Sequence, residues 1–265
     1  MFIVKENVKI IFQINNENFS QIDINPKIIK LLKPRIGLIA LSTDFTIEQD
    51  FRRICHNQNV DIYVNRIPFN NPLNYDNYLK MTDHLTDIAN NILPGEKIDS
   101  IAYGCTSGSV AIGNKKITHE IQKSKPGVYV TTPISAAIKA LTNLKLNKIV
   151  VLTPYPKKVN QSIFDYFTKS NIEIASFHSF NLDYDSDIAS VDPQYLIETI
   201  EKIDQKDTDA IFVSCTALRA VEVLDQIEKK LSKYVISSNQ AIIWDCLRSV
   251  NINSNIEGYG KLFKS

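Results

Sequence analysis

Two cysteines, Cys105 and Cys215, are the residues whose type and position point most directly to chemistry. Each follows a short apolar run that predicts a buried strand and precedes a segment that predicts a helix. A thiol at such a junction is expected to lie near the helix N-terminus, which favours the thiolate and lowers the pKa from about 8.5. The sequence therefore predicts two thiols that can act as an acid, a base or a nucleophile.

The backbone beside these cysteines could bind an anion. The N–H groups of Thr106, Ser107, Thr216 and Ala217 would be unpaired at the two predicted helix starts. Such groups suit a substrate carboxylate or a developing enolate. The alternative is that each cysteine is a buried structural residue and that the threonine after it caps a helix.

The two cysteine motifs occupy matching places in an internal repeat. The segment DSIAYGCTSGS (99–109) matches DAIFVSCTALR (209–219). Two further pairs occur in the same order: RIGLIALSTD (35–44) with KIVVLTPYP (148–156), and VYVTTPISAAIKAL (128–141) with YVISSNQAIIWDCL (234–247). The repeat indicates a duplicated half and favours a functional pair of thiols over two structural ones.

The order of apolar and helical patterns predicts parallel sheets covered by helices. The predicted strands are 35–41, 60–67, 98–104, 127–132, 147–153, 172–178, 209–214 and 234–238. The predicted helices are 46–58, 75–92, 107–123, 133–144, 156–170, 193–204, 217–231 and 239–249.

The duplication predicts the domain organisation. We expect an α/β fold of two similar α/β/α halves related by a pseudo-twofold axis. The first half comprises 34–130 plus 239–265, the second 131–238, and 1–33 form an N-terminal extension that could provide an extra strand or a subunit contact. Ligands of parallel sheets bind beyond the C-terminal strand ends, so the active site is expected in the cleft between the halves.

Composition excludes several classes of function. The formal net charge is +1 and lysines alternate with acidic residues, so no nucleic-acid partner is expected. The N-terminal segment has neither a signal-peptide core nor a membrane span, which predicts a cytoplasmic protein without a membrane partner. We also expect a homo-oligomer, either a dimer or a tetramer.

Neither a disulfide framework nor a metal site is predicted. The other two cysteines, Cys55 and Cys246, lie inside helical patterns and are interpreted as buried core residues. No CxxC pair occurs, and no histidine lies at zinc spacing from a cysteine.

Several separated motifs resemble the aspartate/glutamate racemase superfamily, in its branch of maleate isomerases, arylmalonate decarboxylases and ectoine-utilisation proteins. They are RIGLIALSTDFTIEQDF (35–51), IAYGCTSGS (101–109), TTPISAAIKAL (131–141), IVVLTPYPKKVN (149–160), SCTALRAVEVLDQIE (214–228) and SSNQAIIWDCLR (237–248). The resemblance implies two flavodoxin-like halves and a cofactor-independent enzyme. It also implies that Cys105 and Cys215 are the two catalytic cysteines.

Departures within the motifs narrow the expected activity. Arylmalonate decarboxylases keep only the second cysteine, so the presence of both Cys105 and Cys215 disfavours simple decarboxylation. Thr106-Ser107 and Ala217 differ from the residues usual in glutamate racemases. Tyr155 resembles the cleft tyrosine of maleate isomerases whose hydroxyl binds substrate; the alternative is a half-buried tyrosine at a strand end.

Two acidic residues indicate the charge of the substrate. Maleate isomerases usually have asparagine at the position of Asp44 and another cleft asparagine in the region of Asp185. A carboxylate there repels a dicarboxylate and attracts a basic nitrogen, as in the ectoine-utilisation relatives. Asp44 could instead cap a helix, and Ser42 and Thr43 could bind substrate or serve a turn.

These observations predict a two-cysteine isomerase of a small carboxylate, such as an amino acid or an ectoine-derived compound. Racemisation and cis-trans isomerisation both need two thiols on opposite faces of one planar centre. A lyase like arylmalonate decarboxylase and a non-catalytic protein that binds a small carboxylate are the alternatives.

Overall fold

The computed structural model describes residues 25–29 and 32–265. Lys33–Ser265 forms one compact unit, and the description below concerns this unit. Of the predicted N-terminal extension 1–33, residues 1–24, 30 and 31 lie outside the described part, so its proposed extra strand or subunit contact stays a prediction.

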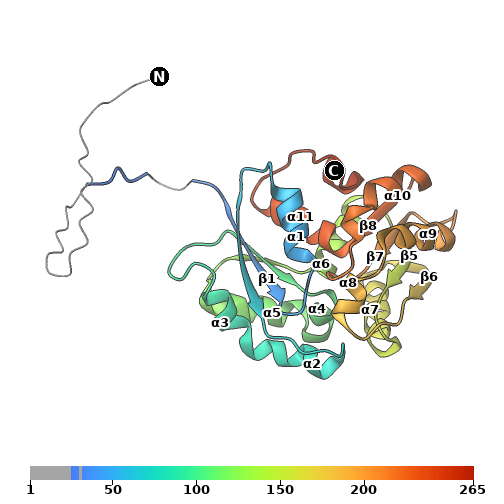
Figure 1. Cartoon of the computed structure of the whole chain (residues 1–265), viewed down its shortest axis with the longest axis horizontal. Helices are drawn as coiled ribbons and strands as arrows, with labels where there is room; N and C mark the ends of the chain where they lie inside the picture. The colour runs from blue at the N-terminus through green and yellow to red at the C-terminus, as the bar shows by residue number, and fades with distance from the viewer. Residues whose placement is uncertain (1–24, 30–31) are drawn as a thin grey trace, which may run out of the picture. The chain divides into compact units, whose positions relative to one another are not determined.

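Two four-stranded parallel sheets form the framework (Figure 1). The first has the order β2-β1-β3-β4 and consists of β1 (Arg35–Leu41), β2 (Asp61–Ile67), β3 (Ser100–Gly104) and β4 (Tyr129–Thr131). The second has the order β6-β5-β7-β8 and consists of β5 (Lys148–Thr153), β6 (Glu173–Ser179), β7 (Ala210–Val213) and β8 (Tyr234–Ser237). The second sheet repeats the topology of the first, which confirms the predicted α/β fold class.

The strands that carry the cysteines lie inside the sheets. Every residue of β3 and of β7 is buried, because each strand has neighbours on both sides and helices over its faces. The edge strands β2 and β6 are partly exposed. The cysteine motifs therefore start from the buried interior of each sheet.

Eleven α-helices and three short 3₁₀ segments connect the strands in the described part of the chain. The helices are α1 (Ile47–Cys55), α2 (Tyr75–Lys80), α3 (Leu85–Asn90), α4 (Thr106–Ile112), α5 (Asn114–Ser124), α6 (Pro133–Asn143), α7 (Lys157–Lys169), α8 (Asp185–Ala189), α9 (Pro193–Ile203), α10 (Leu224–Leu231) and α11 (Ser238–Ser249). The 3₁₀ segments are η1 (Met81–His84), η2 (Ala220–Glu222) and η3 (Lys261–Lys264). Within the described residues, no helix is long and apolar enough to cross a membrane.

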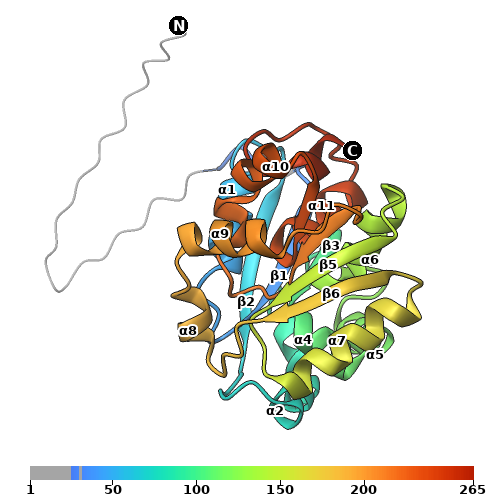
Figure 2. The ribbon, with the colours of Figure 1, turned by 90° about the vertical axis from the view of Figure 1, so that its right-hand side faces the viewer.

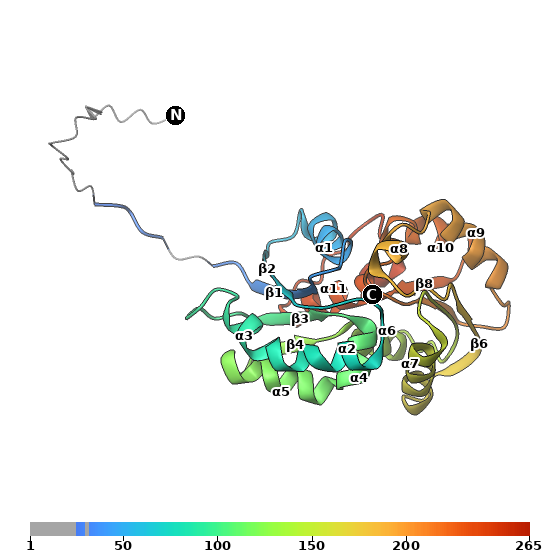
Figure 3. The ribbon, with the colours of Figure 1, turned by 60° about the horizontal axis from the view of Figure 1, so that its bottom comes forward.

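Helix α11 joins the two halves. It follows β8 of the second sheet, yet it packs on β3 and β4 of the first sheet and against α6 and α1. Figure 3 shows α1 and α11 on one side of the first sheet and α2 to α5 on the other. In Figure 2 the second sheet has α7 on one side and α9 and α10 on the other. The exact boundary between the halves, placed at 130/131 and 238/239 by the sequence, stays a prediction.

The structure corrects three predicted helices. The helix predicted over 217–231 starts only at α10, after an irregular segment and η2. The helix predicted over 107–123 is two helices, because Gly113 between them has a φ of +91°, which a helix cannot contain. The helix predicted over 75–92 consists of α2, η1 and α3, and α8 was not predicted.

Candidate functional site

Cys105 is the N-cap residue of α4, where its sulfur accepts a hydrogen bond from the Gly108 N–H at 3.2 Å. The Ser107 hydroxyl lies 3.8 Å from the same sulfur. A Cβ added to Gly108 would stand 2.8 Å from the sulfur and from the Tyr103 hydroxyl, so only glycine allows this close approach. The backbone at 108 therefore serves the thiol directly.

The predicted lowering of the thiol pKa is wrong for Cys105. The side chain is buried, and burial raises its pKa to about 12, while the Gly108 N–H and Ser107 oppose the rise. Desolvation of the thiolate thus outweighs the stabilisation at the helix start. Cys105 is therefore a protonated thiol at neutral pH.

Cys215 lies on a strained loop and not at a helix start. Its φ is +93°, a conformation that costs a non-glycine residue roughly 1–3 kcal/mol and that clusters at functional sites. Burial raises the pKa of its thiol well above the ordinary value, and the nearby Asp185 carboxylate adds to the rise. The Tyr155 hydroxyl and the Ala217 N–H stabilise the thiolate and oppose this effect.

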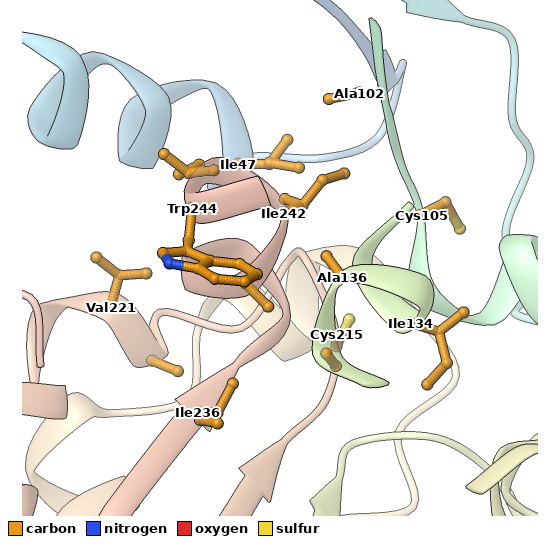
Figure 4. Packing of buried hydrophobic residues seen from close by; sticks show 14 of the residues in the cluster. Ile47, Ala102, Cys105, Ile134, Ala136, Cys215, Val221, Ile236, Ile242 and Trp244 are labelled. Atoms are coloured by element: carbon orange, nitrogen blue, oxygen red, sulfur yellow. The ribbon is translucent and has the colours of Figure 1, made fainter. Parts of the chain in front are cut away.

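Hydrogen bonds join the two cysteine motifs. The Thr106 hydroxyl donates to Ser238 Oγ at 2.9 Å, and the same oxygen accepts the Cys215 N–H at 3.1 Å. The Thr216 hydroxyl donates to the Gly104 carbonyl at 3.4 Å. Figure 4 shows Cys105 and Cys215 within one cluster of buried side chains. The repeat thus brings both predicted cysteines into one site.

Of the two predicted acidic residues, Asp185 has the larger effect on the pKa of both thiols. It is the first residue of α8 and is only 4% exposed, and its carboxylate accepts a hydrogen bond from Thr43 Oγ1 at 2.5 Å. Burial raises its pKa to about 6, although the bond from Thr43 lowers it. Its charge raises the pKa of both Cys105 and Cys215, and Asp44 adds a smaller effect of the same sign, so the carboxylate lies within electrostatic range of both thiols.

Asp44 is bound into the start of α1. Its carboxylate accepts the N–H groups of Thr46 at 2.7 Å and Ile47 at 2.9 Å, so it holds the chain where α1 begins, two residues before the N-cap Thr46. Burial raises its pKa, and these two bonds and one from Thr216 oppose the rise. Ser42 is exposed and exchanges hydrogen bonds with the Phe69 backbone, as a turn residue does.

Two tyrosines line the site, and the sequence pointed to only one of them. Tyr155 is buried, and its hydroxyl accepts a hydrogen bond from Ser214 at 3.4 Å. Tyr78 of α2 is also buried, and its hydroxyl has no hydrogen-bond partner at normal distance among the described residues, although the nearby Ser107 side chain opposes the rise in its pKa. Burial and then the charge of Cys105 raise the pKa of Tyr78, which places it beside the thiols. In the sequence Tyr78 is one apolar position of a helical pattern, so no local signal distinguishes it.

An apolar cavity of about 480 Å³ adjoins Tyr78 and Ser107. It lies between α2, α4 and α7, and its walls are mostly apolar. The other residues that line it are Pro72, Leu73, Asn74, Tyr75, Val110, Ala111, Pro156, Lys157, Lys158, Val159, Ser162, Ile163 and Asp183. A group larger than a methyl therefore has room on the Cys105 side of the site. Among the described residues, no cluster of three or more histidine, cysteine or acidic side chains could hold a metal ion.

The site places two buried thiols between two similar parallel α/β halves, which is the arrangement of a two-cysteine α/β protein. Comparison with known proteins identifies the family. A family model described as arylmalonate decarboxylase matches residues 71–263, most of the chain. The chain belongs to the arylmalonate decarboxylase family, which together with the maleate isomerases is part of the aspartate/glutamate racemase superfamily. The predicted superfamily is confirmed.

Individual relatives include members with two different activities. A maleate isomerase of Geobacillus stearothermophilus is 22% identical over 241 residues, which are 86% of this chain and 96% of the relative. An arylmalonate decarboxylase of Bordetella bronchiseptica is 25% identical over 140 residues, which are 52% of this chain and 58% of the relative.

Solved structures share the fold. The maleate isomerase Iso from Pseudomonas putida superposes with a TM-score of 0.81 at 20% identity, covering 88% of this chain and 98% of that one. A variant of the Nocardia farcinica maleate cis-trans isomerase superposes with a TM-score of 0.79 at 15% identity, covering 87% of this chain and 98% of that one. That structure holds a covalently bound succinylcysteine intermediate.

Proposed function

We propose that this protein is a cofactor-independent isomerase of a small carboxylate and that it works with the thiols of Cys105 and Cys215. The observation that carries the proposal is the pair of buried cysteines, each with its own thiolate stabilisers. Gly108 N–H and Ser107 serve Cys105, while Tyr155 and Ala217 N–H serve Cys215. Two such groups can act on one carbon from two sides.

The same pair suits two reactions. In racemisation, one cysteine as thiolate takes the proton on the carbon next to the carboxylate, and the other thiol gives its proton to the opposite face. In cis-trans isomerisation, a thiolate adds to one carbon of the double bond. The π electrons of that bond move to the other carbon, which becomes a carbanion stabilised by its carboxylate. Rotation about the new single bond follows, and loss of the thiolate restores the double bond. The similarity to maleate isomerases supports this second reaction.

The substrate carboxylate is expected to bind backbone N–H groups of Thr106, Ser107 and Thr216. Asp185 then faces the rest of the substrate, since it lies beside both thiols. A buried carboxylate beside an anionic substrate is repulsive, whereas a basic nitrogen would pair with it. We therefore propose a substrate with one carboxylate and one basic nitrogen, as an amino acid or an ectoine-derived compound has.

Decarboxylation is the second candidate, and the apolar cavity beside Tyr78 and Ser107 favours it. An acid of the malonate type with a bulky apolar group could place that group in the cavity. Loss of carbon dioxide would leave an enolate, which a cysteine thiol would protonate on one face.

One experiment separates the candidates. The protein is incubated in deuterated water with maleate, aspartate, ectoine-derived amino acids and phenylmalonate, followed by mass spectrometry, chiral chromatography and carbon dioxide detection. We expect solvent deuterium at the inverted carbon, or conversion of the double bond, without carbon dioxide. Cys105→Ala and Cys215→Ala should each abolish the reaction while the fold persists. Carbon dioxide release would establish the lyase, and full turnover by either variant would refute the two-thiol mechanism.

A further inference from the structure

The loop that carries Cys215 has no secondary structure of its own to hold it. Residues 214–219 form neither helix nor strand, and Cys215 itself has the strained φ of +93°. A loop in such a conformation persists only when surrounding groups hold it. The groups that hold the loop therefore determine where the Cys215 sulfur lies.

Side chains from two other segments bind the backbone of this loop. Ser238 Oγ accepts the Cys215 N–H at 3.1 Å, and Asn239 Nδ2 donates to the Thr216 carbonyl at 2.8 Å. Thr46 Oγ1 donates to the Ala217 carbonyl at 2.7 Å. Of these three, the bond from Asn239 is made to the residue directly after Cys215 and comes from a side chain that is itself held in place.

Asp50 fixes the orientation of Asn239. The amide nitrogen of Asn239 also donates to Asp50 Oδ2 at 2.8 Å, so both of its hydrogens are used between two acceptors. The Thr216 carbonyl and the ionised Asp50 carboxylate can only accept, so neither binds the amide oxygen, which is buried and has no partner among the described residues. Asp50 is fully buried on α1, and its other oxygen accepts a bond from Arg53 at 3.2 Å.

We infer that Asn239, oriented by Asp50, is a positioning residue that holds Cys215 in its strained conformation. Asn239 is the shortest link from Asp50 to the loop and joins it to the residue directly after Cys215. A longer route through Arg53 and Glu222 reaches only Arg219, at the far end of the loop. The inference rests on the proposed function for its effect on turnover, but not for its effect on the thiol itself.

The test compares Asn239→Ala with Gln240→Ala as a matched control. Gln240 is the next residue of α11, is equally buried, and donates its amide to the Tyr259 carbonyl at 2.6 Å, away from Cys215. Both variants remove one buried amide from the same helix. A general loss of stability would therefore appear in both, and only a positioning role would distinguish them.

The first measurement needs no substrate. Each variant is treated with iodoacetamide at pH 8, and alkylation of Cys105 and Cys215 is followed by peptide mass spectrometry. Asn239→Ala should alkylate Cys215 about 10-fold faster than the parent protein because the loop opens more often, with Cys105 unchanged. Gln240→Ala should leave the ratio of the two rates unchanged. Equal acceleration at both cysteines, or the same change in both variants, would overturn the inference.

The second measurement uses Asp50→Ala, which also covers the case in which Asn239→Ala does not fold. This variant should accelerate alkylation of Cys215 in the same direction, although Asp50 does not touch the loop. On a substrate found in the deuterium screen, both variants should lower kcat by about 10- to 100-fold with little change in KM. The double variant should be no worse than Asn239→Ala, because the two residues act in series.

Asp50→Asn completes the test, because its amide oxygen keeps an acceptor for Asn239. It should restore the alkylation ratio and most of kcat that Asp50→Ala loses. Additive losses in the double variant, or no rescue by Asp50→Asn, would refute the arrangement. If the screen finds no substrate, the alkylation ratios alone decide the inference, so failure of the proposed function stays separate from failure of this one.

Discussion

Thr106 and Ser238 come from different halves of the fold, and the Thr106 hydroxyl donates to Ser238 Oγ at 2.9 Å. Thr106 directly follows Cys105, while Ser238 also accepts the N–H of Cys215. One serine oxygen therefore fixes the distance between the two cysteine segments. The link depends on α11, which leaves the second sheet and packs on the first.

Ser238→Ala should destabilise the protein. The variant leaves the buried Cys215 N–H without a partner, which costs about 1–3 kcal/mol of unfolding free energy. Thr106→Val is the control, since it removes the hydrogen bond from Thr106 to Ser238 but keeps the one that the Cys215 N–H donates to Ser238. Urea unfolding should show a larger loss for Ser238→Ala than for Thr106→Val. Equal losses would show that the bond between the halves, and not the bond to the loop, contributes the stability.

Tyr78→Phe should separate stability from activity. Its hydroxyl is buried without a partner, so removing it should leave the unfolding free energy unchanged or raise it by up to about 2 kcal/mol. If that hydroxyl binds substrate, kcat/KM should fall about 10-fold or more.

Tyr195→Phe is the control for this variant. Tyr195 lies on α9, is exposed and does not line the cavity beside Tyr78. It should change neither the unfolding free energy nor kcat/KM appreciably. An unchanged kcat/KM in Tyr78→Phe would remove Tyr78 from the site.

Asp185→Asn should stabilise the protein at alkaline pH. The pKa of Asp185 rises from 3.8 to about 6 on folding, so the folded state holds this proton more tightly than the unfolded state. Stability is therefore lost as pH rises from about 4 to about 6, by roughly 2–3 kcal/mol for this group. The asparagine removes that loss and keeps an acceptor for Thr43.

Urea unfolding of both proteins at pH 4.5 and pH 8 measures this difference. The variant should be clearly more stable than the parent at pH 8, and the two should converge at pH 4.5. The same variant should lose activity on a substrate with a basic nitrogen and gain on a plain dicarboxylate. A constant stability difference across pH would show that Asp185 does not titrate as its burial requires.

Both site thiols should react slowly with iodoacetamide at neutral pH. Burial raises the pKa of Cys105 to about 12 and that of Cys215 well above its ordinary value, so little thiolate is present. At pH 7.5 we expect each to label roughly 100-fold slower or more than an ordinary exposed thiol, with rates that still rise at pH 10. Protein unfolded in urea is the control, and there both should label at the ordinary rate. Fast labelling of the folded protein would mean that the site is open and its thiols are poised without substrate.

Much of the fold is readable from the sequence. All eight strands of the described part were predicted, because the inner strands are short apolar runs buried between neighbours and the edge strands keep enough β-branched and aromatic residues to show the same pattern. The duplication placed Cys105 and Cys215 at equivalent strand ends, and the structure brings both into one site. The apolar pattern and the internal repeat carry this information, since both depend on which residues are buried on folding.

The rest depends on contacts between distant segments. The segment after Cys215 has the composition of a helix, but its carbonyls are bound by Asn239 and Thr46, and the helix does not form there. The shifts of the two thiol pKa values were predicted with the wrong sign. The local sequence predicts a helix start, which lowers the pKa of a thiol, whereas the burial that raises it comes from contacts between distant segments. Tyr78 was missed for the same reason, since only the folded chain places its hydroxyl beside the thiols.

Burial of the two thiols also has a consequence for their survival. Peroxide and other oxidants attack thiolates far faster than thiols, and they must reach the sulfur to do so. Cys105 is 3% exposed and Cys215 6% exposed, and both are protonated in the resting protein. The resting protein should therefore keep its sulfurs reduced in aerated buffer without added reductant. Its vulnerable moment is turnover, when a thiolate has formed, and inactivation by peroxide should accelerate only while substrate is being converted.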